Sequence, residues 1–246
     1  MRLQDKVIII TGAASGIGLA TAHVCAVEGA RLVLADLPTA PGLGELAALG
    51  GPGAPALVIP ADVRRQDACR AVAAAAVERW GRIDVLINCA GILQGAYLAV
   101  DELDEETFQR VVDVNLTGSF RMCKAVVPAM RQAGRGVIIL IASGAGVRGG
   151  SSSVAYGSSK GGVHGLAMVL EPQLAPLGIR VHDVCPGSLD TPMKRQNVID
   201  AARVRGESPE EALARAQLGD PRGVARVLAF LASDDADYVR GTIFTR

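Results

Sequence analysis

The sequence predicts one α/β domain in which a doubly wound, seven-stranded parallel sheet carries helices on both faces. Short β-branched runs alternate along the chain with longer Ala-rich segments, and 50% of the 246 residues are hydrophobic. Such alternation is typical of a parallel sheet covered on both faces, and right-handed crossovers wind it in two directions. The length suits a single domain. We therefore expect one Rossmann-like domain spanning residues 1–246.

Each strand is predicted from an apolar run and each helix from apolar residues at helical spacing. The expected strands cover residues 7–10, 31–35, 56–59, 84–87, 137–141, 179–184 and 241–244. The expected helices cover residues 16–28, 66–80, 107–131 and 155–177. A last helix should begin at Asp220-Pro221, because aspartate is a good N-cap and proline a good first helical residue. Pro172 should bend or break the helix that contains it.

Charge and cysteine content exclude several classes of protein. The 25 basic and 25 acidic residues cancel, so the chain lacks the positive charge expected of a nucleic-acid or anionic-membrane binder. No stretch approaches the roughly 18 apolar residues of a membrane span. The five cysteines form no CxxC pair, which argues against a disulfide framework or a metal site. We expect a cytoplasmic protein whose partner is a small molecule.

Two segments interrupt the regular alternation. Residues 40–55 are rich in Gly and Pro but too short to separate two cores. Residues 188–219 carry mixed charges, with Pro192 and Pro209, between the sixth strand and the last helix. An insertion there commonly shapes a substrate pocket in open α/β sheets, so we expect a mobile lid. The alternative is a surface excursion without a ligand role.

Three glycines stand where the first strand turns into the first helix, in the run Thr11-Gly-Ala-Ala-Ser-Gly-Ile-Gly18. Glycine permits a tight turn there and lets backbone N–H groups approach a pyrophosphate, while the helix dipole attracts the anion. The spacing is GxxxGxG rather than GxGxxG, so a plain Gly-rich turn is the alternative to a dinucleotide site.

Asp36 favours NAD over NADP as the dinucleotide. It ends the second strand 18 residues after Gly18, near the distance at which a carboxylate accepts hydrogen bonds from the adenosine ribose. A 2′-phosphate would be repelled there, and Ser15, Leu37 and residues 38–44 supply no cation to neutralise it. The alternative is that Asp36 caps the next turn.

A phenol and an ammonium stand four residues apart in Tyr156-Gly-Ser-Ser-Lys160, on one face of an expected helix. A nearby cation lowers the pKa of a phenol from about 10, which would let Tyr156 exchange an alcohol proton near neutral pH. Ser143, 13 residues earlier at a strand end, could hydrogen-bond the same oxygen. Taken alone, a Tyr–Lys pair at this spacing is more often a solvated helix face.

Together these motifs resemble the short-chain dehydrogenase/reductase family. Its order and spacing are followed across the chain by residues 11–18, Asp62-Val63, Asn88-Cys-Ala-Gly91, Asn115, Ser143, Tyr156-x-x-x-Lys160 and Pro186-Gly187. The resemblance implies a catalytic tetrad of Asn115, Ser143, Tyr156 and Lys160. Tyr156 would be the general acid/base, and Lys160 would bind the nicotinamide ribose and lower the tyrosine pKa. Ser143 would orient the substrate oxygen, and Asn115 would distort its helix and hold a water in a proton relay.

The resemblance also implies where a cofactor and a substrate bind. The residues implied to hold the cofactor are Gly12, Ser15, Gly16, Ile17, Gly18, Asp36, Leu37, Asp62, Val63, Asn88, Ala90, Gly91, Ile141, Tyr156, Lys160, Pro186, Gly187, Leu189 and Thr191. Asp62 would bond the adenine amino group, and Thr191 the nicotinamide carboxamide. The residues expected around the substrate are Gln94, Ala145, Val147, Val154, Ser188 and Met193.

Three features depart from the family pattern. Cys89 replaces the more common asparagine, and we expect it to be a buried packing residue. His182 stands in the sixth strand where the family often has asparagine, and we expect it to make structural hydrogen bonds. The sequence ends at Arg246, before the family's Val-Asp-Gly-Gly, so the homotetramer that the resemblance implies has a dimer as its alternative.

The sequence thus predicts an NAD-dependent enzyme that interconverts a secondary alcohol and a ketone. Its substrate would be a sugar, polyol, cyclic alcohol or hydroxyacyl compound, with no metal involved. The first alternative is a 3-oxoacyl reductase acting on acyl carrier protein. The second is a dinucleotide-binding sensor without turnover, because a fold alone does not guarantee activity. Loss of Tyr156, Lys160 or Ser143 would mark such a sensor, and all three are present.

Overall fold

The computed structural model describes residues 1–49 and 56–245, in which seven parallel strands form one sheet. The strands are β1 (Val7–Thr11), β2 (Arg31–Asp36), β3 (Ala56–Pro60), β4 (Val85–Asn88), β5 (Gly136–Ile141), β6 (Ile179–Cys185) and β7 (Gly241–Phe244). Their order is β3-β2-β1-β4-β5-β6-β7, so the chain starts inside the sheet and builds outward in both directions. The predicted doubly wound parallel sheet is confirmed. Residues 50–55 of the predicted Gly/Pro-rich segment, and Arg246, lie outside the described residues.

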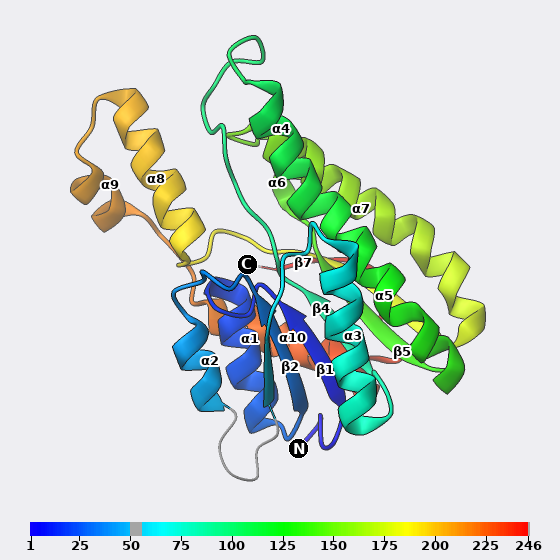
Figure 1. Ribbon diagram of the computed structural model, residues 1–246. Helices are drawn as coiled ribbons and strands as arrows, with labels where there is room; N and C mark the ends of the chain where they lie inside the picture. Colours follow the sequence, from blue (N-terminus) through cyan, green and yellow to red (C-terminus); the bar gives the residue numbers. More distant parts are fainter. Residues whose placement is uncertain (50–55, 246) are drawn as a thin grey trace.

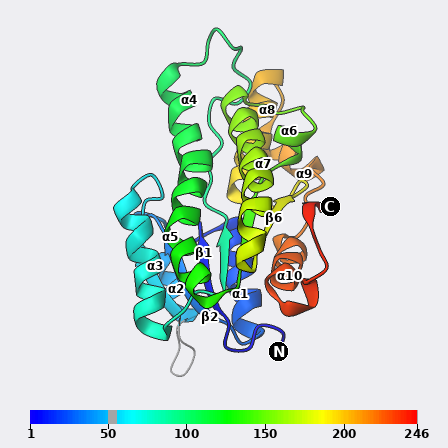
Figure 2. The same cartoon turned by 90° about the vertical axis from the view of Figure 1, so that its right-hand side faces the viewer.

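Helices cover both faces of the sheet (Figure 1). They are α1 (Gly16–Val27), α2 (Leu43–Leu49), α3 (Gln66–Trp80), α4 (Glu105–Val112), α5 (Gly118–Ala133), α6 (Gly144–Val147), α7 (Val154–Leu174), α8 (Pro192–Arg205), α9 (Pro209–Arg215) and α10 (Pro221–Ala232). Figure 2 shows α3, α5 and α7 on one side of the strands and α10 on the other. The side chain of Asp220 accepts from Arg222 N–H at 2.8 Å, so the last helix begins as predicted.

The central strand β1 explains the two-layered core. All five of its residues are buried. Val7 and Ile9 pack in the layer that contains α3, α5 and α7, whereas Ile8 and Ile10 pack in the layer of α1 and α10. Successive strand side chains point to opposite faces, so an uninterrupted apolar run is the pattern expected of a strand covered on both sides.

Two helix predictions were wrong in part. The expected helix over residues 107–131 is two helices, α4 and α5, joined by a π-helical turn over Asp113–Thr117. Pro172 does not break α7, which continues to Leu174 and then tightens into a 3₁₀ turn over Ala175–Leu177. A proline so close to the helix end removes only one backbone bond, and Leu174 beyond it is buried in the core.

The expected hydrogen-bonding role of His182 is wrong. The side chain is fully buried in β6, and neither ring nitrogen has a partner among the described residues. Burial, aided by Arg180 and Arg240, lowers the pKa of His182 to about 4. The adjacent Asp183 points to the other face and bonds His164 Nδ1 at 2.7 Å.

Residues 188–219, the predicted lid, begin and end side by side. Leu189 pairs with Gly219, and Asp190 N–H donates to the Gly219 carbonyl at 2.8 Å. Figure 1 shows α8 and α9 of this segment at one side of the top of the molecule and α6 with α7 at the other. Movement of the segment stays a prediction. In the part of the chain that the structure describes, no helix has the length and apolar character to cross a membrane.

Candidate active site

The loop between β1 and α1 is shaped for close approach to the backbone. Gly12 has φ +63°, and a Cβ added there would lie 2.7 Å from the Ala90 amide nitrogen, so glycine alone fits against the loop after β4. Ser15, the N-cap of α1, makes no side-chain capping bond, and the first helical turn holds no acidic residue. The first N–H groups of a helix have no intrahelical partners, so this turn can bind an anion such as pyrophosphate.

This loop lines a cavity of about 340 Å³ at the carboxyl ends of β1 to β4. The predicted cofactor residues that line it are Gly12, Ser15, Gly16, Ile17, Gly18, Asp36, Leu37, Asp62, Val63, Ala90, Gly91 and Thr191. Open α/β sheets bind ligands at this place. The glycine cradle, the helix N-terminus and the carboxylate of Asp36 fit a nicotinamide dinucleotide.

Asp36 lies at the edge of this cavity with its carboxylate fixed. Oδ2 accepts from Ala14 N–H at 2.8 Å, and Oδ1 accepts from Leu37 N–H at 2.8 Å. The two bonds hold the charge against the glycine loop and leave lone pairs for further donors, such as ribose hydroxyls.

Two arginines that line the cofactor cavity were missed by the sequence analysis. Arg64 bonds Asp62 through Nε at 2.9 Å and Nη2 at 2.7 Å, while Arg110 pairs with Glu106. The guanidinium of Arg64 lowers the pKa of Asp62. The sequence held a signal for Arg64, because it follows the end of β3, where a parallel strand delivers residues to the site.

Asn88 lies beneath the cavity rather than in its wall. Its Oδ1 accepts from Thr11 Oγ1 at 2.8 Å, and its Nδ2 donates to Ser119 Oγ at 2.9 Å. Thr11 Oγ1 in turn accepts from Ala90 N–H at 3.2 Å. Asn88 is thus part of a buried network that positions Ala90, and a direct contact of Asn88 with the cofactor stays a prediction.

The π-helical turn places Asn115 between the loop after β4 and α7. Oδ1 accepts from Ile92 N–H at 2.8 Å, and Nδ2 donates to the Ile92 carbonyl and to Ser159 Oγ, both at 2.9 Å. Such single π turns are frequent at functional sites. The helix is distorted at Asn115, as the resemblance implied; its part in a proton relay stays a prediction.

Tyr156 and Lys160 are presented by the first turns of α7. The N-cap Ser153 accepts from Tyr156 N–H at 3.1 Å, which starts the helix just before the tyrosine. Lys160 Nζ is buried, lies 5.7 Å from the centre of the Tyr156 ring and donates to the Ile141 carbonyl at 2.7 Å. A Cβ added to Gly91 would lie 3.4 Å from Lys160 Nζ, so the loop after β4 also reaches this group.

The pKa values of the pair differ from the sequence expectation. Burial raises the pKa of Tyr156, and the neighbouring Ser143 side chain opposes the rise only in part. Burial lowers the pKa of Lys160 to about 8. The expected lowering of the Tyr156 pKa by Lys160 is wrong for the protein alone, because desolvation of the phenolate outweighs other effects and the ammonium is directed at the Ile141 carbonyl. Burial thus favours the neutral phenol of Tyr156 in the protein without a cofactor.

A second cavity, of about 420 Å³, adjoins the first and is lined by both Ser143 and Tyr156. The two cavities share Ile17, Thr191 and Met193. Five residues predicted to touch the cofactor line this second cavity instead of the first: Ile141, Tyr156, Pro186, Gly187 and Leu189. Lys160 is not in the wall of either cavity. We refer to the second cavity as the substrate cavity.

The predicted substrate residues divide into two groups. Ala145, Ser188 and Met193 line the substrate cavity, whereas Gln94, Val147 and Val154 do not. The Gln94 carbonyl accepts from Ser153 Oγ at 2.6 Å, so this residue fixes the start of α7. Val147 packs against the core, and Val154 lies in a separate surface hollow beside α4. Because the short helix α6 is a run of small residues, its sequence did not indicate which of its side chains face the cavity.

Among the polar residues of the substrate cavity, Tyr97, Ser152, Lys194 and Asn197 were missed by the sequence analysis. Tyr97 has φ 64°, and its N–H donates to the Ser152 carbonyl at 2.6 Å. Asn197 Nδ2 donates to Ser152 Oγ at 2.8 Å. These contacts tie α8 and the loop after β4 to Ser152. The only signal in the sequence was that Tyr97, Lys194 and Asn197 follow the ends of strands.

Comparison with known proteins agrees with this geometry. The sequence model of the short chain dehydrogenase family matches residues 6–201. The chain therefore belongs to the short-chain dehydrogenase family. It is an oxidoreductase with the fold that binds a nicotinamide dinucleotide.

Individual relatives cover nearly the whole chain. The chain is 39% identical to 3-oxoacyl-(acyl-carrier-protein) reductase FabG of Thermotoga maritima, across 99% of this chain and 96% of that protein. It is 37% identical to trans-4-hydroxycyclohexanecarboxylate dehydrogenase of Sinomonas cyclohexanicum, across 98% of this chain and 90% of that protein. The crystal structure of an actinorhodin polyketide ketoreductase variant with NADPH aligns with a TM-score of 0.90 at 36% identity, covering 98% of this chain and 95% of that one.

Proposed function

We propose that this chain is an NAD-preferring enzyme that interconverts a secondary alcohol and a ketone, with Tyr156 as the general acid/base. The observation that carries the proposal is that the cavity of Ser143 and Tyr156 joins the glycine-loop cavity through Ile17, Thr191 and Met193. One cavity can hold a dinucleotide and its neighbour the molecule that exchanges a hydride with it.

The proton chemistry follows from the residues. A bound nicotinamide supplies the hydride for reduction and accepts it in oxidation. In reduction, the phenol of Tyr156 gives its proton to the carbonyl oxygen while the carbon gains the hydride. In oxidation, the phenolate takes the alcohol proton while the carbon loses the hydride. Because burial raises the pKa of Tyr156, oxidation should become faster as the pH rises into the alkaline range.

Asp36 supports the preference for NAD. Its fixed carboxylate would accept hydrogen bonds from ribose hydroxyls and repel a 2′-phosphate. The two arginines that line the described part of this cavity are already paired, Arg64 with Asp62 and Arg110 with Glu106. A related ketoreductase was crystallised with NADPH, so the preference needs a direct test.

Replacing Asp36 by alanine tests this preference. Asp36→Ala should weaken NAD binding about 10-fold or more, since hydrogen bonds to a charged group are lost, and should leave NADP binding nearly unchanged or tighter. Dissociation constants measured by calorimetry for both cofactors check this. Arg64→Gln serves as the control and should not weaken NAD by this much. Equal losses of NAD and NADP in Asp36→Ala would contradict recognition of the ribose.

The proposed substrates are sugars, polyols, cyclic alcohols or hydroxyacyl compounds. Reduction of 3-oxoacyl groups is the alternative that the relative from Thermotoga maritima favours, and cyclic alcohols are favoured by the relative from Sinomonas cyclohexanicum. The test is NADH and NADPH formation across a panel of these classes. Turnover confined to one class would identify the substrate class. Tight NAD binding without turnover of any member would favour a dinucleotide sensor.

We further propose a homotetramer in the cytoplasm, with a dimer as the alternative. Exposed apolar side chains on α5 and α7, namely Phe120, Met168 and Val169, support self-association. The five free thiols suit a reducing compartment. Light scattering coupled to gel filtration would give the number of subunits.

A further inference from the structure

The charged side chains that line the substrate cavity are of one sign. Lys194 is the one residue with a charged side chain in that part of its wall which the structure describes, where aspartate and glutamate are absent. The remaining wall combines apolar side chains with serines, Tyr97, Tyr156 and Asn197. A cavity of about 420 Å³ is within the size of small-molecule sites, in which a few charged or polar groups fix the orientation of the ligand.

The position of Lys194 on α8 is fixed. The N-cap Thr191 accepts from Lys194 N–H at 3.2 Å, and Thr191 itself lines both cavities. Asn197, one turn later on the same helix face, is buried and tied to Ser152 across the cavity. These contacts hold the face of α8 that carries Lys194 against the substrate cavity.

Lys194 differs from the other cations of α8. Arg195 pairs with Asp190, Arg203 with Asp200, and Arg205 with Glu207. Lys194 is partly buried and has no ion pair or side-chain hydrogen bond to any other described residue. A solvated surface explains the three arginines, but it does not explain a lysine in the wall of a cavity without an acidic residue.

We propose that Lys194 binds a carboxylate of the substrate, so that the enzyme acts on hydroxy acids or oxo acids. The proposal rests on the proposed function, since it assigns a substrate class to the cavity of Ser143 and Tyr156. The carbinol or carbonyl group lies at Ser143 and Tyr156, and the carboxylate lies at Lys194. An ammonium discriminates between a carboxylate and its neutral amide, because the amide carbonyl can accept the same hydrogen bond but lacks the negative charge that attracts the ammonium.

A binding experiment tests the proposal without depending on turnover. Cyclohexanecarboxylate and cyclohexanecarboxamide are titrated by calorimetry into the full-length protein and into two variants. Lys194→Met and Arg195→Met each remove one positive charge from α8, but only the first alters the cavity. The unmodified protein and Arg195→Met should bind the carboxylate about 10-fold or more tightly than the amide. Lys194→Met should bind the two within about twofold. Equal binding by the unmodified protein, or a preference that survives Lys194→Met, would overturn the proposal.

Turnover separates this proposal from the proposed function. With NAD present, 4-hydroxycyclohexanecarboxylate should lose about 10-fold or more in kcat/KM in Lys194→Met, mainly through KM, while its neutral carboxamide should be unaffected. A selective carboxylate site without turnover of either compound would support the site and count against the proposed function. Turnover of both compounds at equal rates, unchanged in Lys194→Met, would support the function and overturn the site.

A third pair of ligands distinguishes another source of negative charge. The phosphate of a 4′-phosphopantetheine arm could also meet a lysine, so this compound is compared with pantetheine. A preference for the phosphate that disappears in Lys194→Met, without any preference for the carboxylate, would overturn the carboxylate assignment in favour of an acyl-carrier substrate.

Discussion

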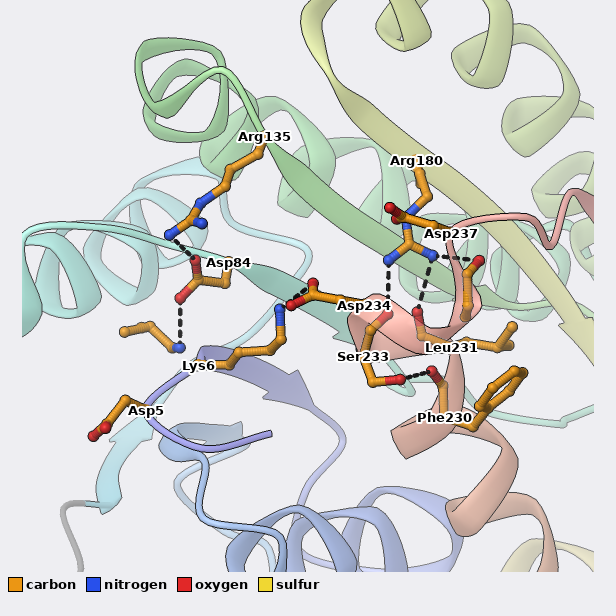
Figure 3. A network of polar contacts seen from close by, with 12 residues as sticks. Asp5, Lys6, Asp84, Arg135, Arg180, Phe230, Leu231, Ser233, Asp234 and Asp237 are labelled. Carbon is orange, nitrogen blue, oxygen red and sulfur yellow. Dashed lines mark hydrogen bonds and ion pairs between the residues drawn. The ribbon is translucent and has the colours of Figure 1, made fainter. Parts of the chain in front are cut away.

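The two ends of the sheet use charged side chains in opposite ways. At the amino ends of the strands, charges are paired and join segments that lie far apart in the sequence (Figure 3). Asp84, before β4, accepts from Val7 N–H at 2.8 Å, and Lys6 bonds Asp234 at 2.6 Å. Arg180 of β6 donates to the carbonyls of Ser233 and Ala236, both at 2.9 Å. The contacts tie β1, β4, β6 and the turn after α10 together.

At the carboxyl ends, polar groups are left for ligands. The N-cap Ser15 makes no capping bond, and Lys194 has no partner among the described residues. The difference teaches that the satisfied end stabilises the fold, which allows the other end to keep unsatisfied groups for binding and chemistry.

The largest expected effect comes from a substitution at the carboxyl ends of the strands, which should impair activity alone. Tyr156→Phe removes the proton donor, so kcat should fall about 100-fold to 10,000-fold, while the free energy of unfolding and the affinity for NAD stay nearly unchanged. NADH formation, thermal melting and cofactor titration measure the three quantities. Near-normal turnover would refute the acid/base role of Tyr156.

A smaller effect, on stability, is expected from a substitution at the amino ends of the strands. Asp84→Ala leaves Val7 N–H and the Arg82 side chain without their buried acceptor, so the protein should lose about 2–3 kcal/mol of unfolding free energy. Turnover per folded molecule should be unchanged. Asp67→Ala, which breaks the exposed pair with Arg65, is the control and should cost much less, because water screens this pair. Urea denaturation curves at pH 7.5 give both numbers, and an equal cost for the two variants would contradict the comparison.

The sheet could be predicted because its signal is local. Each strand is a short apolar run between turn residues, and both faces are covered, so the pattern needs no long-range information. The π turn at Asp113–Thr117 could not be predicted from apolar spacing. It depends on the hydrogen bonds of Asn115 with Ile92 and Ser159, both of which are far from Asn115 in the sequence.

The site could be predicted only as far as its motifs reach. The glycine loop, Asp36, Ser143 and Tyr156 stand at strand or helix ends and line the two cavities, while their roles stay predictions. The substrate wall is different, because Tyr97, Lys194 and Asn197 meet through the folding of two long excursions. Asn88 shows the same limit, since a buried bond to Ser119 decides its orientation and no spacing announces that bond.

The last expected effect concerns His182, which belongs to neither end. It is buried in the middle of β6 without a hydrogen-bond partner among the described residues, so it should cost stability rather than add to it. His182→Leu keeps a similar volume and removes the polar ring. At pH 7.5 we expect it to raise the free energy of unfolding by about 1–3 kcal/mol.

The pH dependence sharpens this prediction. Folding lowers the pKa of His182 from 6.5 to about 4, so the unfolded chain binds the proton more tightly between these values. Protonation of His182 therefore favours unfolding, and stability should fall by about 3 kcal/mol as the pH drops from 6.5 towards 4. Above pH 7 this contribution is constant. His182→Leu should remove that part of the acid sensitivity, whereas the exposed His23→Gln should keep it. Urea denaturation curves at pH 7.5, 6 and 5 measure the difference. Parallel stability curves for His182→Leu and the unmodified protein would show that the ring is hydrogen-bonded or solvated after all.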